Sequence, residues 1–223
     1  YWVYEKYPEI VPVGWDGKPA PTKTVDYLAP GFLEAARNWY RAVMGVIAPR
    51  LITNGGNIIA VQLDNEIGML SWVSNSPDLT EGVLGDFAQW LRTKYGPVQL
   101  AARYPFDMEN VDVRRDAVRS PKEAYAAALM HDLGCYMRNR FARYVAALRS
   151  YAEEFGVKDV PFVINIHGTS GGRGFTYPIG ISQLYESYTQ APGYLSGSDI
   201  YFADLDMQTF QDLYIINGFM DAV

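Results

Sequence analysis

Apolar residues recur at steps of three and four positions in several long stretches of this chain, which is the period of an amphipathic helix. Pro30 and Pro49 stand near the two ends of the first stretch, where proline fits a first turn and weakens a last one. Gly156 is a typical C-terminal stop for the longest stretch. The predicted helices span residues 31–52, 79–95, 120–156, 181–191 and 207–220.

Two of these helices carry N-terminal capping signals. Asp78 is followed by Glu81 three residues later, and Ser120 is followed by Glu123 with proline between them. Both pairs have the spacing of a capping box, in which the first side chain accepts a backbone N–H of the first turn. We therefore expect caps at Asp78 and Ser120.

Short apolar runs between turn residues predict three strands, at 58–63, 160–168 and 194–202. The run 58–63 lies between Gly55-Gly56 and Gly68 and is apolar at nearly every position, as in a strand buried on both faces. Each strand follows a predicted helix. This alternation favours an α/β fold with a parallel sheet.

Two segments show neither the helical period nor the apolar run of a strand. Residues 1–29 are rich in proline and glycine and read as loop, and residues 101–119 are mixed in charge and read as a surface insertion. The chain of 223 residues is otherwise long and apolar enough for one sizeable core.

Polar side chains cluster where the first two predicted strands end. Asp64, Asn65 and Glu66 follow the run 58–63, while Asn165 and His167 alternate onto one face at the end of the second strand. The carboxyl ends of parallel strands meet at one edge of a sheet, where α/β proteins place their chemistry. Glu66, with an amide beside it, is a candidate acid for group transfer.

Composition narrows the class of protein. The net charge is −6 without a Lys/Arg run, which argues against a nucleic-acid partner, and no apolar run is long enough for a membrane span. The single cysteine, Cys135, excludes an internal disulfide and a cysteine-based metal site, and is compatible with a cytoplasmic or a secreted protein. His131 lies four residues from Cys135, a spacing that favours packing over metal binding here. We expect no metal and no cofactor.

The stretch Gly55–Gly68, with Gln62-Leu-Asp-Asn-Glu66 at its centre, resembles the acid/base strand of β-galactosidases in glycoside hydrolase families 35 and 42. A second segment, Phe87–Leu100, resembles the helix that follows this strand in family 42. A third, Gly197–Tyr201, is similar to the family's Trp-Asp-x-Tyr-Pro strand, with Ser198 in place of Trp. Many members have an aromatic residue after the Glu, where this chain has Ile67.

The resemblance implies a (β/α)8 TIM barrel of the retaining clan, of which this chain would hold about strands 4 to 6 and their helices. Residues 1–223 would then be a partial catalytic domain, with 1–29 as the loop after strand 3. The clan's nucleophile ends strand 7, so we expect it beyond Val223 and assign that role neither to Glu186 nor to Asp199.

The resemblance also implies residue roles. Glu66 would be the general acid/base and Asn65 would bind the sugar 2-hydroxyl. Further substrate contacts are expected from Trp72, Asn165, His167 and Tyr201, with a structural hydrogen bond as the alternative for His167.

These observations favour a retaining glycoside hydrolase that cleaves terminal β-galactosides, with a carbohydrate as its ligand and homo-oligomerisation left open. Another β-glycosidase or an endo-β-glycanase of the same clan is the near alternative. A non-catalytic carbohydrate-binding barrel is the alternative from a different class. For Glu66 itself, the alternative is a salt-bridged carboxylate at a strand end.

Overall fold

A parallel three-stranded sheet forms the centre of the protein. The computed structural model describes residues 2–20, 24–67, 76–166, 189 and 192–197. Within them the sheet order is β1-β2-β3, and both pairings are parallel, as the sequence predicts. The strands are β1 (Val61–Ile67), β2 (Phe162–Ile166) and β3 (Tyr194–Gly197).

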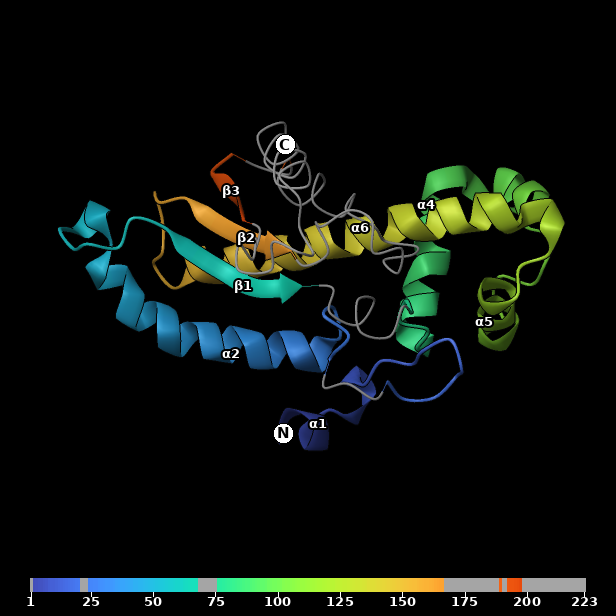
Figure 1. Ribbon diagram of the computed structural model, residues 1–223, viewed down its shortest axis with the longest axis horizontal. Coiled ribbons are helices and arrows are strands. Elements are labelled where there is room, and N and C mark those ends of the chain that lie inside the picture. The colour runs from blue at the N-terminus through green and yellow to red at the C-terminus, as the bar shows by residue number, and fades with distance from the viewer. Residues whose placement is uncertain (1, 21–23, 68–75, 167–188, 190–191, 198–223) are drawn as a thin grey trace, which may run out of the picture.

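Two long helices run alongside this sheet (Figure 1). Helix α2 spans Pro30–Ile47 and α6 spans Glu123–Glu154; they contact each other, and α6 also contacts β1. Helices α4 (Glu81–Arg103) and α5 (Val111–Arg119) gather at one end of α6, away from the sheet. Because helix alternates with parallel strand, the arrangement agrees with part of an α/β barrel.

The first strand differs from its prediction in position and in burial. It begins at Val61 instead of Ile58, because the N–H of Ile58 donates to the carbonyl of Arg50 and ties this part of the chain to the turn before it. Ile59 is 66% exposed, and buried and accessible residues alternate along the first half of β1. The strand therefore buries one face against the helices instead of both.

Helix α2 ends near its second proline. Pro30 occupies the first turn as predicted, and the α-helix stops at Ile47 before a 3₁₀ turn, Ala48–Arg50, that contains Pro49. A further 3₁₀ turn, Ile52–Asn54, leads to Gly55 at a φ of 82°. The predicted weakening of the last turn is confirmed.

Residues 101–119, predicted to lack helical periodicity, are largely helical. Helix α4 bends at Gly96, where φ is 71° just before Pro97, and then continues to Arg103. Residues 111–119 form α5, whose buried face includes Ala117 and Val118. The helical period was hidden because α5 is short and carries few apolar residues. It is specified instead by Asn110, whose side chain accepts two N–H groups of the first turn.

Both predicted caps are also wrong. The cap of α4 is Thr80, whose hydroxyl accepts from the N–H of Val83, and α6 starts after Lys122 without a side-chain cap. Ser120 instead ends α5. The C-terminal stop of α6 is as predicted, with Gly156 at a φ of 94° directly after the C-cap residue Phe155.

The remaining segments follow the sequence in part. Residues 2–20 are largely loop but include the short helix α1 (Trp2–Lys6) and a 3₁₀ turn, Pro8–Ile10. The predicted helix 207–220 lies outside the described residues, as does all but Thr189 of the predicted helix 181–191. No described helix combines the length and apolar character that a membrane crossing needs.

Asp78 precedes the start of α4, and its buried carboxyl group makes the stability of the protein depend on pH. Its Oδ1 accepts from the N–H groups of Thr80 (2.9 Å) and Val13 (3.2 Å), while its Oδ2 is buried without a hydrogen-bond partner among the described residues. Burial raises the pKa of this carboxyl to about 6. Because the folded pKa exceeds the unfolded one, the folded state holds the proton more tightly. Stability is therefore lost as the pH rises from about 4 to above 6, by about 3 kcal/mol.

We expect Asp78→Asn to gain stability relative to the wild type as the pH rises through this range. The amide keeps an oxygen for Thr80 and Val13 but carries no charge. Melting temperatures of both proteins at pH 4.5 and 7.5 test this prediction. Asp16→Asn, at an exposed turn aspartate that accepts from the N–H of Lys18, is the matched control. An Asp78→Asn difference that does not change with pH would contradict the expectation.

Candidate active site

The C-terminal half of β1 is irregular where the polar cluster begins. The register against β2 shifts between Gln62 and Asn65 and again between Asn65 and Ile67, so β1 accommodates extra residues as bulges. Glu66 lies in the second irregularity, is half-buried and has a φ of 51°, in the left-handed region that non-glycine residues rarely adopt. Bulges re-aim side chains and are frequent beside active sites.

The two predicted asparagines lie side by side. Asn65 and Asn165 are register partners across β1 and β2, and Asn165 Nδ2 donates to Asn65 Oδ1 at 3.2 Å. The same oxygen accepts from Gln62 Nε2 at 3.1 Å. Two donors on one amide oxygen fix the orientation of the Asn65 side chain. Asn165 is buried whereas Asn65 is exposed. The buried Asn165 therefore anchors the Asn65 amide, which remains accessible to solvent.

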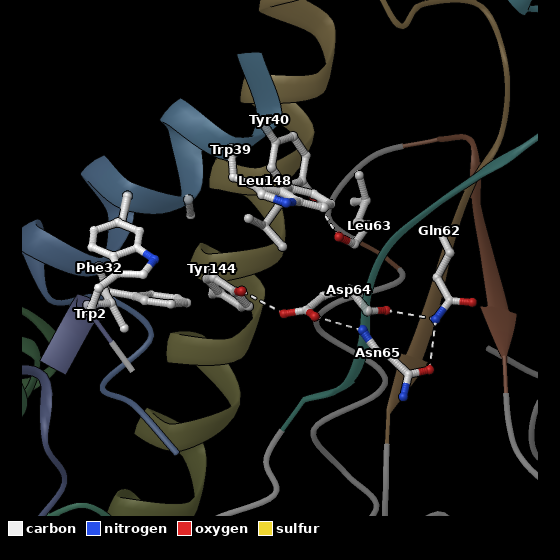
Figure 2. A pocket seen from close by; sticks show the side chains of 13 residues that line it. Trp2, Phe32, Trp39, Tyr40, Gln62, Leu63, Asp64, Asn65, Tyr144 and Leu148 are labelled. Carbon is white, nitrogen blue, oxygen red and sulfur yellow. Dashed lines mark hydrogen bonds between the residues drawn. The ribbon is translucent and has the colours of Figure 1, made fainter. Parts of the chain in front are cut away.

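Asp64 points the opposite way. Figure 2 shows its carboxylate directed toward Tyr144 of α6, while Asn65 turns toward Gln62 on the other side of the strand. The Tyr144 hydroxyl donates to Asp64 Oδ2 at 2.6 Å, and the N–H of Asn65 donates to Asp64 Oδ1 at 2.8 Å. Burial raises the pKa of Asp64 above its ordinary value, although these two hydrogen bonds favour the carboxylate. Asp64 thus joins the strand end to the helix layer.

A pocket of about 540 Å³ lies on the Asp64 side, between α1, α2, β1 and α6. Aromatic side chains form much of its wall, and Asp64 and Asn65 are among its polar lining, whereas Glu66 is not part of it (Figure 2). The aromatic lining residues are Trp2, Phe32, Trp39, Tyr40 and Tyr144.

Similarity to known proteins agrees with this geometry. The sequence pattern of glycosyl hydrolases family 35 matches residues 21–113. A β-galactosidase from the psychrophilic Marinomonas ef1 superposes with a TM-score of 0.63 at 14% identity, over 90% of this chain and 29% of that one. These similarities support a β-galactosidase-like glycoside hydrolase of the TIM-barrel clan.

Curated relatives of this β-galactosidase-like chain carry other activities in their names. A β-1,2-glucosyltransferase of Ignavibacterium album is 26% identical over 176 residues, which is 78% of this chain and 24% of that protein. An exo-β-D-glucosaminidase of Thermococcus kodakarensis is 30% identical over 172 residues, 73% of this chain and 21% of that protein. The chain thus spans less than a quarter of the length of either relative.

The β-galactosidase-like structure places only some of the predicted site residues. Asn65, Glu66 and Asn165 meet at the carboxyl ends of β1 and β2. Trp72, His167 and Tyr201 lie outside the described residues. Sequence reasoning missed Gln62 and Tyr144 as neighbours of the site, because the bulge brings Gln62 to Asn65 and tertiary packing brings Tyr144 to Asp64. The only sequence signal that Asp64 belongs to the site was its place in the polar cluster beside Asn65 and Glu66.

The described part of the chain holds no group of three His, Cys, Asp or Glu side chains close enough to bind a metal ion. His131 and Cys135 lie 3.5 Å apart (Nε2 to Sγ) on α6, and Arg138 Nη2 also donates to the sulfur at 3.1 Å. The positive charge of Arg138 beside the sulfur would repel a metal cation, so this pair is an unfavourable metal site.

Proposed function

We propose that this chain contributes barrel strands 4 to 6 of a retaining glycoside hydrolase that cleaves terminal β-galactosides. The observation that carries the proposal is the convergence of Asn65 and Asn165 beside Glu66 at the carboxyl edge of the sheet. In a β-galactosidase-like chain, this edge is where substrate would bind.

The proposed reaction is a double displacement between two carboxyl groups about 5–5.5 Å apart. A carboxylate outside residues 1–223 attacks the anomeric carbon while Glu66 donates its proton to the glycosidic oxygen, so the C–O bond breaks and the alcohol leaves. Glu66, now a carboxylate, takes a proton from water, whose oxygen attacks the anomeric carbon. The sugar is released with retained configuration, and both carboxyl groups return to their initial states.

Asn65 would recognise the sugar 2-hydroxyl. Since Gln62 and Asn165 both donate to its Oδ1, the amide NH₂ is the part that faces away from them. That group would donate to the sugar O2, a contact that tightens in the oxocarbenium-like transition state.

The second candidate is cleavage of β-glucosaminides, which is favoured by the similarity to the exo-β-D-glucosaminidase of Thermococcus kodakarensis. The two substrates differ at C2 and C4 of the sugar. The test is hydrolysis, by the protein that carries this chain, of nitrophenyl β-galactoside, β-glucoside and β-glucosaminide. The proposal expects the highest kcat/KM for the galactoside. A clear preference for the glucosaminide selects the second candidate, and absence of hydrolysis of any of them contradicts a glycosidase.

We expect Asn65→Ala to lower kcat/KM for the preferred nitrophenyl glycoside by about 10²-fold or more, because hydrogen bonds to O2 supply several kcal/mol in the transition state. The matched 2-deoxy glycoside lacks the 2-hydroxyl and should react equally slowly with both proteins. Comparing the two substrates with both proteins forms a double-mutant cycle. Equal losses on both substrates would mean that Asn65 does not contact O2.

A further inference from the structure

Side chains hold the backbone on both sides of Asp64. The Tyr40 hydroxyl of α2 donates to the carbonyl of Leu63, and Asp64 Oδ1 accepts from the N–H of Asn65. Asp64 Oδ2 is in turn bound by the Tyr144 hydroxyl of α6. Both oxygens of Asp64 are thus engaged, one with the backbone next to Glu66 and one with the helix layer.

These anchors are themselves fixed by burial. Tyr40 and Tyr144 are 3% and 2% exposed. The Tyr144 ring packs against Tyr27 at 4.7 Å between centroids. Burial and the neighbouring Asp64 charge raise the pKa of Tyr144, so its hydroxyl keeps its proton and remains a donor at neutral pH.

Glu66 follows these Asp64 contacts in a backbone conformation that other contacts must stabilise. A non-glycine residue at a φ of 51° persists only where surrounding contacts determine it. The Asp64 contacts fix the peptide between Asp64 and Asn65, and Asn165 and Gln62 fix the Asn65 side chain. The direction of the Glu66 side chain therefore depends on the register of the bulge before it.

We propose that Asp64, tied to Tyr144, is a positioning residue that holds the β1 bulge so that Glu66 meets the glycosidic oxygen. The inference rests on the proposed function of Glu66. A purely structural role for the Asp64–Tyr144 contact would instead lower stability without affecting proton donation specifically.

Leaving-group dependence separates the two roles. A dinitrophenolate leaves without a proton, whereas a methyl or sugar alcohol needs the acid. In kcat/KM, which reports steps up to the first bond cleavage, misplacing the acid therefore slows only the alkyl substrate.

The experiment compares Tyr144→Phe with Tyr136→Phe in the protein that carries this chain. Tyr136 is the matched control, because it is a fully buried tyrosine of α6 whose hydroxyl lies 2.8 Å from Asp86 Oδ2 and 2.9 Å from the carbonyl oxygen of Val83, both in α4. Tyr144→Phe should lower kcat/KM for methyl β-galactoside roughly tenfold, with less than about a twofold change for the dinitrophenyl substrate. Tyr136→Phe should leave the ratio of the two substrates unchanged. Asp64→Asn, measured in parallel, should show the same selective loss if Tyr144→Phe does not fold.

The positioning role is overturned if these variants change both substrates by one common factor or change neither. Glu66→Ala serves as the reference for the function on which the inference rests. If that variant also cleaves the methyl glycoside at the wild-type rate, the proposed function fails. If it loses the methyl glycoside while Tyr144→Phe behaves like Tyr136→Phe, only the positioning role fails.

Discussion

Replacing Glu66 with alanine should lower kcat/KM for an alkyl β-galactoside by about 10²–10⁴-fold, the usual contribution of general acid catalysis. An alkoxide is a poor leaving group, so cleavage without a proton donor has a much higher barrier. The dinitrophenyl galactoside should keep most of its kcat/KM, since its leaving group needs no proton. Steady-state rates of both substrates measure the effect.

Glu123→Ala is a suitable control for this variant. Glu123 is an exposed carboxylate at the start of α6, far along the chain from β1. Its removal should leave both substrates unchanged. Wild-type rates on the alkyl galactoside with Glu66→Ala would remove Glu66 from the mechanism and favour the alternative of an ordinary carboxylate at a strand end.

The largest stability effect is expected from Asp132→Ala. Asp132 of α6 is fully buried and accepts from two residues on each side of the bend in α4. Its carboxylate therefore fixes the bent helix against α6. The donors are Lys94 Nζ (2.8 Å), Tyr95 Oη (2.8 Å), Arg103 Nε (3.2 Å) and Tyr104 Oη (2.5 Å).

Removing this carboxylate should cost about 3–5 kcal/mol of unfolding free energy, because it leaves charged and hydroxyl donors without their acceptor. Lys94 and Arg103 are about one-third exposed and can rehydrate, which favours the lower end of that range. Urea denaturation measures the loss. Asp112→Ala is the control, since Asp112 is 80% exposed and its pair with Arg115 should contribute less than about 1 kcal/mol.

The Asp132 contribution should also depend on pH. Burial acts to raise the pKa of Asp132, but hydrogen bonds from Lys94, Tyr104 and Tyr95 outweigh it and hold the pKa below its ordinary value. For an acid with a lowered folded pKa, the stabilisation is present above the unfolded pKa of about 4 and disappears as the pH falls further. Equal stability of Asp132→Ala and the wild type at pH 7 would contradict this account.

The sequence predicted the long helices and the parallel strands of this protein better than the segments that connect them. Long helices and the parallel strands follow from apolar periodicity, and the meeting of Asn65 with Asn165 follows from the shared edge of parallel strands. Helix α5 escaped prediction because a capping side chain specifies it more than its apolar pattern does. The misplaced start of β1 reflects hydrogen bonds between Ile58 and the preceding turn that no local pattern encodes.

The candidate active site was likewise predicted only in part. The polar cluster after the apolar run predicted where Glu66 and Asn65 would lie, as strand-end residues. Sequence could not predict that a bulge brings Gln62 to the same side as Asn65, or that Tyr144, 80 residues later in the chain, would bind Asp64. Tyr144 has the position of an ordinary buried residue on the apolar stripe of α6, and only the packed structure reveals its partner.

The most direct test of the central claim is the anomeric configuration of the product that Glu66→Ala forms from dinitrophenyl β-galactoside in the presence of azide. If Glu66 is the general acid/base, its removal opens the face from which water normally attacks the glycosyl-enzyme. Azide should then accelerate turnover and give the β-galactosyl azide, with retained configuration, by proton NMR. Formation of the α-galactosyl azide would instead make Glu66 the nucleophile, and the absence of any azide product or acceleration would contradict its role as acid/base.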